Sequence, residues 1–327
     1  MNMNSSALEK NGTTTTDANT GSRIVEFFRL LPKDLRKNKY IYLIALPAII
    51  YYLVFCYFPM YGAVIAFKDF SPTEGILRSP WVGFKNFTDF FNGIYFFRLV
   101  KNTLLLNLYN LLWGFPAPVI LALLLNEIRN RAFKRTVQTI TYLPHFVSTV
   151  VICGMIIDFT SRNGLINNLL SIFGVERANL LMDAGLFRTI YVSTSIWQEV
   201  GWGTIIYLAA MSGIDGELYQ ACEIDGGGRF RQLLHITLPG IVPTIVILLI
   251  LRMGSMMNVG FEKVFLLYNP VTYETADVIS TYVYRKGILE ASYSFSTAVG
   301  LFNSVINFAL LIIANKISQK VNETSLW

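Results

Sequence analysis

Charged residues are scarce in this sequence. Asp, Glu, Lys and Arg together make up only 15% of its 327 residues, whereas hydrophobic residues make up 53%. A soluble globular domain carries roughly 25% charged residues. The shortage of charge argues against an ordinary soluble domain, so a membrane protein is the first class to test.

Cysteine and histidine are also scarce, with three and two residues respectively. Cys56 and Cys153 fall in apolar segments and Cys222 in a polar one, with no spacing typical of a metal site or a disulfide framework. His145 and His235 lie far apart in the sequence with no ligand-like neighbours, and we interpret both as ordinary packed or interfacial side chains. A membrane-embedded enzyme would need a nucleophile–base pair or a metal cluster, and the sequence indicates neither.

An ATP-binding loop is missing as well. The Walker pattern requires a Lys followed by Ser or Thr after its glycines, and the nearest glycine run, "DGGGRF", lacks that pair. The net charge of +6 does not indicate nucleic acid, because the basic residues cluster beside apolar segments. The chain is therefore expected neither to hydrolyse ATP nor to bind nucleic acid.

Long apolar segments are what the sequence does contain. A membrane helix needs about 20 predominantly apolar residues. Several of the segments contain Pro or Gly, which membrane helices tolerate where neighbouring helices satisfy the freed backbone groups. The pattern predicts an all-α integral membrane protein with six transmembrane helices, at roughly 40–66, 99–125, 137–159, 187–211, 241–260 and 294–315.

Basic residues indicate the direction of the first helices, because Lys and Arg favour the cytoplasmic ends of membrane spans. They precede the first segment and separate the second from the third: Arg23, Arg29, Lys33, Arg36, Lys37 and Lys39, then Arg129, Arg131, Lys134 and Arg135. Both sections are expected in the cytoplasm, which places both termini there.

The resulting organisation has four parts. Residues 1–38 are polar and predict a disordered cytoplasmic tail. Residues 39–98 hold the first membrane helix and an outer loop, residues 99–316 form the core domain, and residues 317–327 form a cytoplasmic tail.

Two outer loops, 79–91 and 268–287, are aromatic, rich in turn residues and mixed in charge. We expect short ordered elements in both, at the outer membrane interface where Trp and Tyr are favoured. They are interpreted either as docking surfaces or as interfacial anchors.

A polar hairpin, "QACEIDGGGRFRQLLHITLPG" at 220–240, separates the fourth and fifth apolar segments. "DGELYQACEI" predicts one short helix, and "DGGG" at 225–228 must break it because three glycines cost backbone entropy and permit a positive φ. A second helix is expected over "RFRQLLHIT", ending before Pro239 because the residue preceding proline is pushed out of helical geometry.

This hairpin resembles the coupling segment of ABC importer permeases, whose pattern is E-A-A, then a spaced D-G, then I-x-L-P. The matching residues are Gln220-Ala221-Cys222, Asp225-Gly226 and the sequence ITLP at 236–239. Gln220 replaces the usual Glu and Cys222 the second Ala, which puts in doubt a salt bridge from position 220 but not docking. "WVGFKNF", "NEIRNRAFKR", "YLPHFVSTVV" and "ADVISTYVYRKG" are similar to the polysaccharide-type sugar permeases of Gram-positive bacteria, relatives of the maltose-transporter permeases.

The resemblance implies a type I ABC importer permease in the bacterial cell membrane that imports polysaccharide-derived oligosaccharides. It implies a second homologous permease, an extracellular sugar-binding (lipo)protein and an ATPase dimer that binds ATP and Mg; this chain would bind no cofactor. The hairpin, 215–239, would pass the movement of the ATPase into the membrane helices. The residues expected to couple to the ATPase are Glu217, Gln220, Ala221, Cys222, Asp225, Gly226, Arg229, Leu238 and Pro239.

Arg252 is the main candidate for a substrate pathway. It lies inside the fifth apolar segment, where a charge costs at least about 2.5–3.5 kcal/mol. It either faces a cavity or pairs with a partner helix. In a cavity it would suit acidic oligosaccharides such as those from pectin or alginate. Asn258 and Glu262 follow near the outer end of the same segment.

Three aromatic residues of the fourth segment, Tyr191, Trp197 and Trp202, are further candidates. Their rings could stack on sugars, or they could pack at the membrane interface. An ion-gradient-driven secondary sugar transporter is the alternative function, but such carriers usually place carboxylates inside the membrane. Only Asp158 and Glu199 come near, both close to segment ends.

Overall fold

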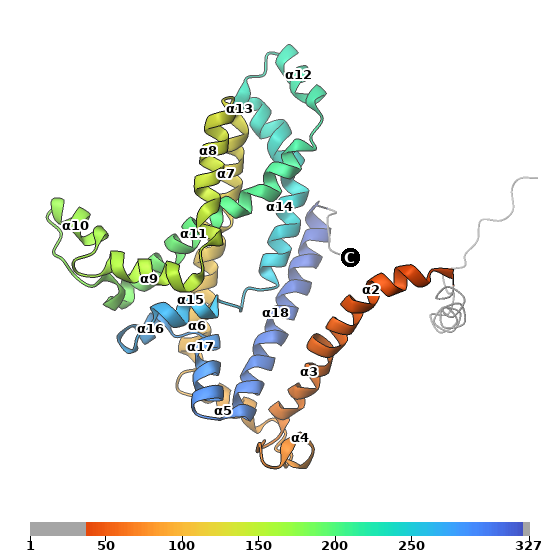
Figure 1. Cartoon of the computed structure of the whole chain (residues 1–327), viewed down its shortest axis with the longest axis vertical. Helices are drawn as coiled ribbons and strands as arrows, with labels where there is room; N and C mark the ends of the chain where they lie inside the picture. The colour runs from red at the N-terminus through yellow and green to blue at the C-terminus, as the bar shows by residue number, and fades with distance from the viewer. Residues whose placement is uncertain (1–36, 323–327) are drawn as a thin grey trace, which may run out of the picture. The chain divides into compact units, whose positions relative to one another are not determined.

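The computed structural model describes residues 37–322, and almost all of its regular structure is helical (Figure 1). Within this range there is one isolated antiparallel β-bridge, between Lys68 and Trp81. Nearly all of the tail predicted at 1–38, and the last five residues, lie outside the described range. The chain divides into two compact units, 1–62 and 63–327, which are described separately.

The first unit contains most of one long apolar helix. This helix ends at Phe67, five residues beyond the end of the unit at Gly62. Lys39–Phe67 is long and apolar enough to cross a membrane, in agreement with the predicted segment 40–66. The helix contains Pro47 and changes its winding along its length. Its successive pieces are α2 (Lys39–Tyr51), the π-helix η1 (Tyr52–Tyr57), α3 (Phe58–Met60) and the 3-10 helix η2 (Tyr61–Phe67).

The second unit is built around long helices that run between two ends, α12 at one and α5 at the other (Figure 1). α14 and α18 lie side by side, and α11 packs against α7, α8 and α14. The longer helices are α6 (Phe96–Tyr109), α7 (Pro116–Glu127), α8 (Arg131–Tyr142), α9 (Thr149–Thr160), α11 (Ala184–Ser212), α14 (Leu238–Met253) and α18 (Tyr293–Asn322).

Short helical pieces connect these helices and in places lengthen them. α4 (Gly75–Arg78) and α5 (Lys85–Phe91) precede α6, and η3 (Asn110–Gly114) joins α6 to α7. The remaining pieces are η4 (Leu143–Phe146), α10 (Leu165–Ile172), η5 (Leu180–Met182), α12 (Gly216–Ile224), α13 (Arg229–Gln232), η6 (Leu233–Thr237), α15 (Phe261–Leu267), η7 (Pro270–Thr272), α16 (Tyr273–Ala276), α17 (Ile279–Tyr284) and η8 (Arg285–Leu289). Both predicted outer loops thus contain short helices, as expected.

Five helices in the described range could cross a membrane by length and composition. Besides Lys39–Phe67 they are Phe96–Glu127, Thr149–Ile172, Arg229–Met253 and Tyr293–Lys320. The fourth predicted segment, 187–211, is helical throughout within α11 but is not among the five. Its hydropathy is reduced by polar residues such as Gln198 and Glu199 near its centre. The expectation that Glu199 lies close to a segment end is therefore wrong, since α11 extends more than ten residues beyond it on either side.

The third predicted span, 137–159, is wrong as a single helix. α8 ends at Tyr142, and residues 147 and 148 have extended backbone before α9 begins. Ser148 is the cause, because its side chain accepts a hydrogen bond from the N–H of Val151 and caps α9. A capping serine offers the backbone an alternative to continued helix.

The fifth predicted span, 241–260, is wrong at both ends. The helix begins at Arg229, because α13, η6 and α14 are continuous. It ends at Met253, and residues 254–260 form a turn in which the N–H of Met257 donates to Asn307 Oδ1 of α18 at 2.7 Å. Side-chain partners on α18 thus replace the next helical turn, and the residues after 253 leave the helix axis.

The helix expected to stop before Pro239 instead continues through it. Pro239 is the second residue of α14 but lies inside the continuous helix, so its missing N–H removes one hydrogen bond there. The preceding turn, η6, is a π-helix, whose wider winding gives room to the proline ring. The hairpin's second arm and the fifth membrane helix are therefore one helix.

Candidate functional site

A cavity of about 760 Å³ opens between α7, α11, α14 and α15. The sequence-predicted pathway residues are largely gathered around it, since Tyr191, Trp202, Arg252, Asn258 and Glu262 line it. Trp197, also expected there, does not; its side chain is 48% exposed elsewhere on α11.

Arg252 comes from the last turn of α14, whereas Asn258 lies in the turn that follows and Glu262 at the start of α15. The three residues therefore reach the cavity from different elements, not from one helix as expected. Among the described residues Arg252 has no carboxylate within ion-pair distance. Arg252 is thus a lining residue of the cavity without an ion-pair partner in the described part of the chain, and its role in a substrate pathway stays a prediction.

Lys263 is a second cation in the cavity wall, and sequence reasoning missed it. Its side chain is buried, with 6% exposure, and its Nζ donates to Ser195 Oγ of α11 at 3.0 Å. The ammonium also lies 5.5 Å from the centre of the Tyr191 ring. Burial lowers the pKa of Lys263 to about 8, an effect that the charges of Cys153 and Glu199 only partly offset. α15 lies outside the five candidate spans.

His145 is a packed side chain, as interpreted from the sequence, and it has a carboxylate partner that the sequence did not indicate. Its Nδ1 lies 3.0 Å from Glu199 Oε2, and its ring stacks on Trp202 with centroids 4.4 Å apart. The end of α8 approaches α11 closely because Gly201 of α11 has no side chain. A Cβ at position 201 would lie 2.0 Å from the carbonyl oxygen of Thr141 in α8. The residues are 54 positions apart, so no local pattern indicated the pair.

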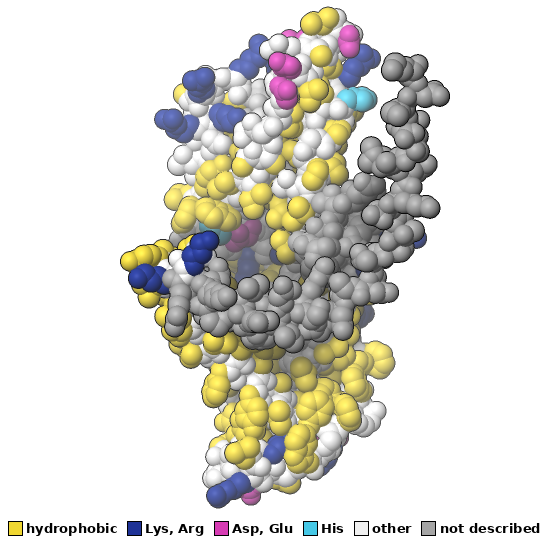
Figure 2. All heavy atoms as spheres, turned by 90° about the vertical axis from the view of Figure 1, so that its right-hand side faces the viewer, with side chains coloured by type: hydrophobic (Ala, Val, Ile, Leu, Met, Phe, Trp, Pro, Cys, Tyr) yellow, Lys and Arg dark blue, Asp and Glu magenta, His cyan; other side chains and the backbone are white. Residues whose placement is uncertain are grey.

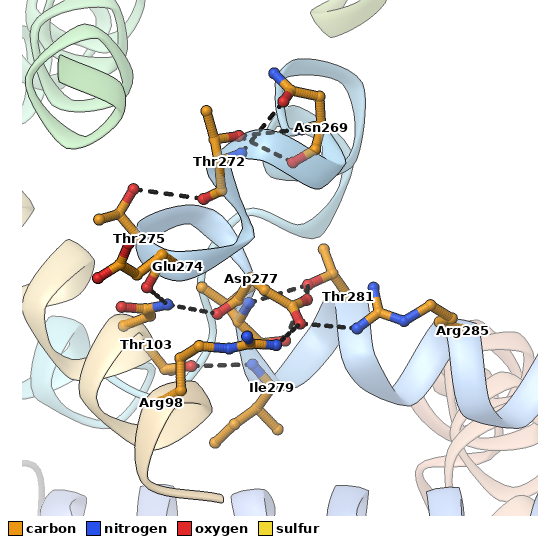
Figure 3. Close-up of polar contacts among 12 residues, drawn as sticks. Arg98, Thr103, Asn269, Thr272, Glu274, Thr275, Asp277, Ile279, Thr281 and Arg285 are labelled. Carbon is orange, nitrogen blue, oxygen red and sulfur yellow. Dashed lines mark hydrogen bonds and ion pairs between the residues drawn. The ribbon is translucent and has the colours of Figure 1, made fainter. Parts of the chain in front are cut away.

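A buried carboxylate organises the segment that follows α15 (Figure 3). Asp277, which is fully buried, accepts hydrogen bonds from Arg285 at 2.7 Å, from Arg98 at 3.4 Å and from Thr281 at 2.9 Å. Since Arg98 comes from α6, the three donors join α6 to α17 and η8. Burial of such a charge is tolerated because it is paired and hydrogen-bonded.

The same segment is also tied to α11. Arg188 of α11 donates to Asn102 Oδ1 at 2.8 Å, and Asn102 Nδ2 donates to the carbonyl oxygens of Glu274 and Asp277. Thr103 Oγ1 accepts the N–H of Ile279 at 3.0 Å (Figure 3). These bonds hold α16 and α17 against α6 and α11, and so fix the end of α15 that leads into them.

The hairpin forms as predicted up to its second helix. Asp215 caps α12 by accepting a hydrogen bond from the N–H of Glu217 at 2.9 Å. The helix ends before Gly226, which has φ +74°. Tyr219 Oη lies 3.0 Å from Thr237 Oγ1 and closes the two arms. The hairpin is thus a small folded unit and not a loose connector.

The residues expected to couple to the ATPase lie mostly on the hairpin surface. Seven are exposed, and two are half-buried: Cys222 and Leu238. Two large apolar side chains at its tip are also open, Ile224 at 86% and Phe230 at 73% exposure. Acidic and basic side chains gather at this end, above a surface with many hydrophobic side chains (Figure 2).

Comparisons with known proteins show relatives along most of the chain. A family profile, "Binding-protein-dependent transport system inner membrane component", matches residues 114–323. Protein LplB of Bacillus subtilis (strain 168) is 50% identical over 90% of this chain and 92% of its own length. The polygalacturonan/rhamnogalacturonan transport system permease protein YteP of the same organism is 47% identical over 91% of this chain and 93% of its own length.

Solved structures agree with this relationship. A bacterial ABC transporter involved in the import of the acidic polysaccharide alginate contains a chain that is 44% identical, with a TM-score of 0.83, over 89% of this chain and 99% of that one. A bacterial alginate ABC transporter in complex with alginate pentasaccharide-bound periplasmic protein gives 43% identity and a TM-score of 0.84 over 91% of this chain and 100% of that one. The similarity contradicts the alternative of an ion-gradient-driven carrier. The chain is a transport permease of the ABC importer type in the cell membrane, not an enzyme, and it belongs to the family of binding-protein-dependent transport system inner membrane components.

Proposed function

We propose that this permease imports carboxylate-bearing oligosaccharides released from an acidic polysaccharide such as pectin or alginate. The observation that carries the proposal is the pair of relatives whose names specify acidic polysaccharides, YteP at 47% identity and the alginate importer chain at 44%. Each aligns with about nine-tenths of this chain. An extracellular binding protein would deliver the sugar, as the alginate transporter's complex with its periplasmic protein suggests.

The charges of the cavity support an acidic substrate. Arg252 and Lys263 line it without a carboxylate at ion-pair distance in the described residues. Of its two carboxylates, Glu199 is engaged by His145. Lys263 is buried, so it attracts an anion more strongly than it would in water, and the exposed Arg252 adds a second positive charge to the wall. Trp202 supplies an aromatic ring of the kind that sugars stack on.

We further propose six membrane spans in a type I importer fold, with both termini in the cytoplasm. α11 supplies the span absent from the five candidates, since its 29 residues extend about 43 Å, more than the hydrocarbon core of roughly 30 Å requires. Its polar residues face the cavity, where a membrane helix tolerates them.

ATP and Mg would be bound by a separate ATPase dimer that docks on the hairpin, 215–239, while a second homologous permease completes the pathway. The continuous helix Arg229–Met253 supports this arrangement, because it joins the hairpin directly to Arg252 in the cavity wall. A displacement of the hairpin would move that wall of the cavity. ATPase closure and sugar binding would therefore shift the same equilibrium between two positions of this helix.

Uptake of labelled oligosaccharides tests the proposal. Cells carrying the complete transporter, and cells lacking only this permease, are given oligogalacturonate, alginate oligosaccharide or a neutral oligosaccharide of equal length. We expect uptake of an acidic sugar to require both the permease and ATP. This uptake should persist when a protonophore is added and the ATP concentration is maintained. Permease-dependent uptake of the neutral sugar alone would overturn the proposed substrate class.

A further inference from the structure

We propose that the Lys263 ammonium forms a binding site for one sugar carboxylate inside the cavity; the inference rests on the proposed function. The Ser195 hydroxyl donates its own proton to the carbonyl oxygen of Tyr191 at 2.7 Å, so it positions the ammonium by accepting from it and does not itself bind the carboxylate. Lys263 has only 6% exposure and is one of the residues that line the cavity. An ammonium has three donors, and the hydrogen bond to Ser195 Oγ at 3.0 Å uses one of them. The remaining donors are available to a ligand that enters the cavity.

The site is held rigidly. The neighbour of Lys263 along α15, Val264, is fully buried, and Leu267 anchors the same helix in the hydrophobic core with α9 and α11. The ammonium also lies 5.5 Å from the centre of the Tyr191 ring, and Tyr191 is itself only 4% exposed. The lysine therefore cannot swing into bulk water, and a carboxylate would meet a group already in position.

No acidic side chain in the described residues neutralises this charge. Glu199, a carboxylate of the cavity wall whose charge acts on Lys263, is paired with His145. Glu262 precedes Lys263 on the same helix, where successive residues do not face each other. A buried ammonium is unfavourable unless it is paired. An anionic ligand would supply the missing counter-charge, whereas a neutral sugar of the same shape would not.

A matched substrate pair tests the site. The complete transporter, reconstituted in proteoliposomes with its binding protein and ATPase, is supplied with an oligogalacturonate and with its neutral methyl ester. In Lys263→Gln the KM for the acid should rise about ten- to hundredfold, as expected for the loss of one charge-assisted hydrogen bond. The KM for the ester should change less than about threefold, and Lys263→Arg should keep the preference for the acid.

The control is Lys320→Gln, which removes the same charge from an exposed lysine near the end of α18, outside the cavity, and should leave both KM values unchanged. An equal loss of transport for acid and ester in Lys263→Gln would indicate a structural lysine and overturn the inference. An unchanged preference for the acid would overturn it too. A wild-type transporter that ignores the acid would defeat the proposed function itself, whatever the variants do.

Discussion

The charge of Lys263 depends on pH in the range where cells grow. Burial lowers the pKa to about 8 from an ordinary 10.5, so the cation is present below that pH and lost above it. The titratable groups around the ammonium are Cys153 on α9, Tyr191 and Glu199 on α11, and Glu262 beside it. Of these, Cys153 and Glu199 raise the pKa without cancelling the effect of burial.

We therefore expect uptake of an acidic oligosaccharide to fall several-fold between pH 7 and pH 9, with both sides of the membrane at the same pH. Lys263→Arg should remove this decline, because a guanidinium stays protonated throughout the range. Initial uptake rates in proteoliposomes measure the effect, with the neutral methyl ester as a reference for general losses. A wild-type profile that matches the Lys263→Arg profile would contradict the assignment.

Asp277 is expected to matter for stability and not for the passage of sugar. Asp277→Asn leaves Arg98 and Arg285 facing a neutral amide, and breaking a buried ion pair costs about 3–5 kcal/mol. The variant should unfold at a clearly lower temperature in detergent. Glu290→Gln removes a carboxylate from the exposed pair with Lys286, worth at most about 1 kcal/mol, and should have little effect. Equal shifts in the two variants would refute the role of Asp277 at the centre of this network.

The cavity residues differ in how visible they are in the sequence. Arg252 stands out because it interrupts an apolar run, and the structure places it on the cavity. Lys263 follows a glutamate in a short charged pair, which is typical of an exposed loop. Its burial depends on the packing of α15 against α9, a contact between segments about 110 residues apart that no local pattern records.

The helices were predictable where apolar runs are uninterrupted and less so where they break. The first and last spans match the predicted segments because their hydrophobic residues continue for a full membrane thickness. The errors fall at Ser148, at Pro239 and after Met253, where a cap, a π turn and two asparagines of α18 decide the backbone. Each depends on side-chain partners or winding that hydropathy does not measure.

The turn of the hairpin provides a test of the link between α12 and α13. Gly226 has φ +74° with open space around it, whereas Gly228 has φ −76° in equally open space. Gly226→Val should strain the turn, because a β-branched residue rarely adopts a positive φ. We expect uptake to be lost while the amount of permease in the membrane stays normal. Gly228→Val should keep most of the uptake, and equal activity of the two variants would contradict a rigid hairpin.

Large apolar side chains are exposed at both ends of the second unit. Ile224 belongs to α12 and Phe230 to α13, whereas Leu77, 81% exposed, belongs to α4, which lies at the opposite end of the second unit from α12 (Figure 1). In the proposed topology the hairpin is in the cytoplasm, so an ATPase would cover its tip. Burying one such side chain contributes about 1.5–3 kcal/mol to association.

Replacing Ile224 and Phe230 together by Ser should therefore weaken ATPase binding by at least about a hundredfold. Affinity-purified permease from the double variant should retain little ATPase, and a sugar-loaded binding protein should no longer stimulate hydrolysis. Leu77→Ser removes an equally exposed side chain at the other end and should leave the ATPase attached. If the double variant retains ATPase at the wild-type ratio, the tip of the hairpin is not the docking surface, and force would have to enter the helix Arg229–Met253 elsewhere.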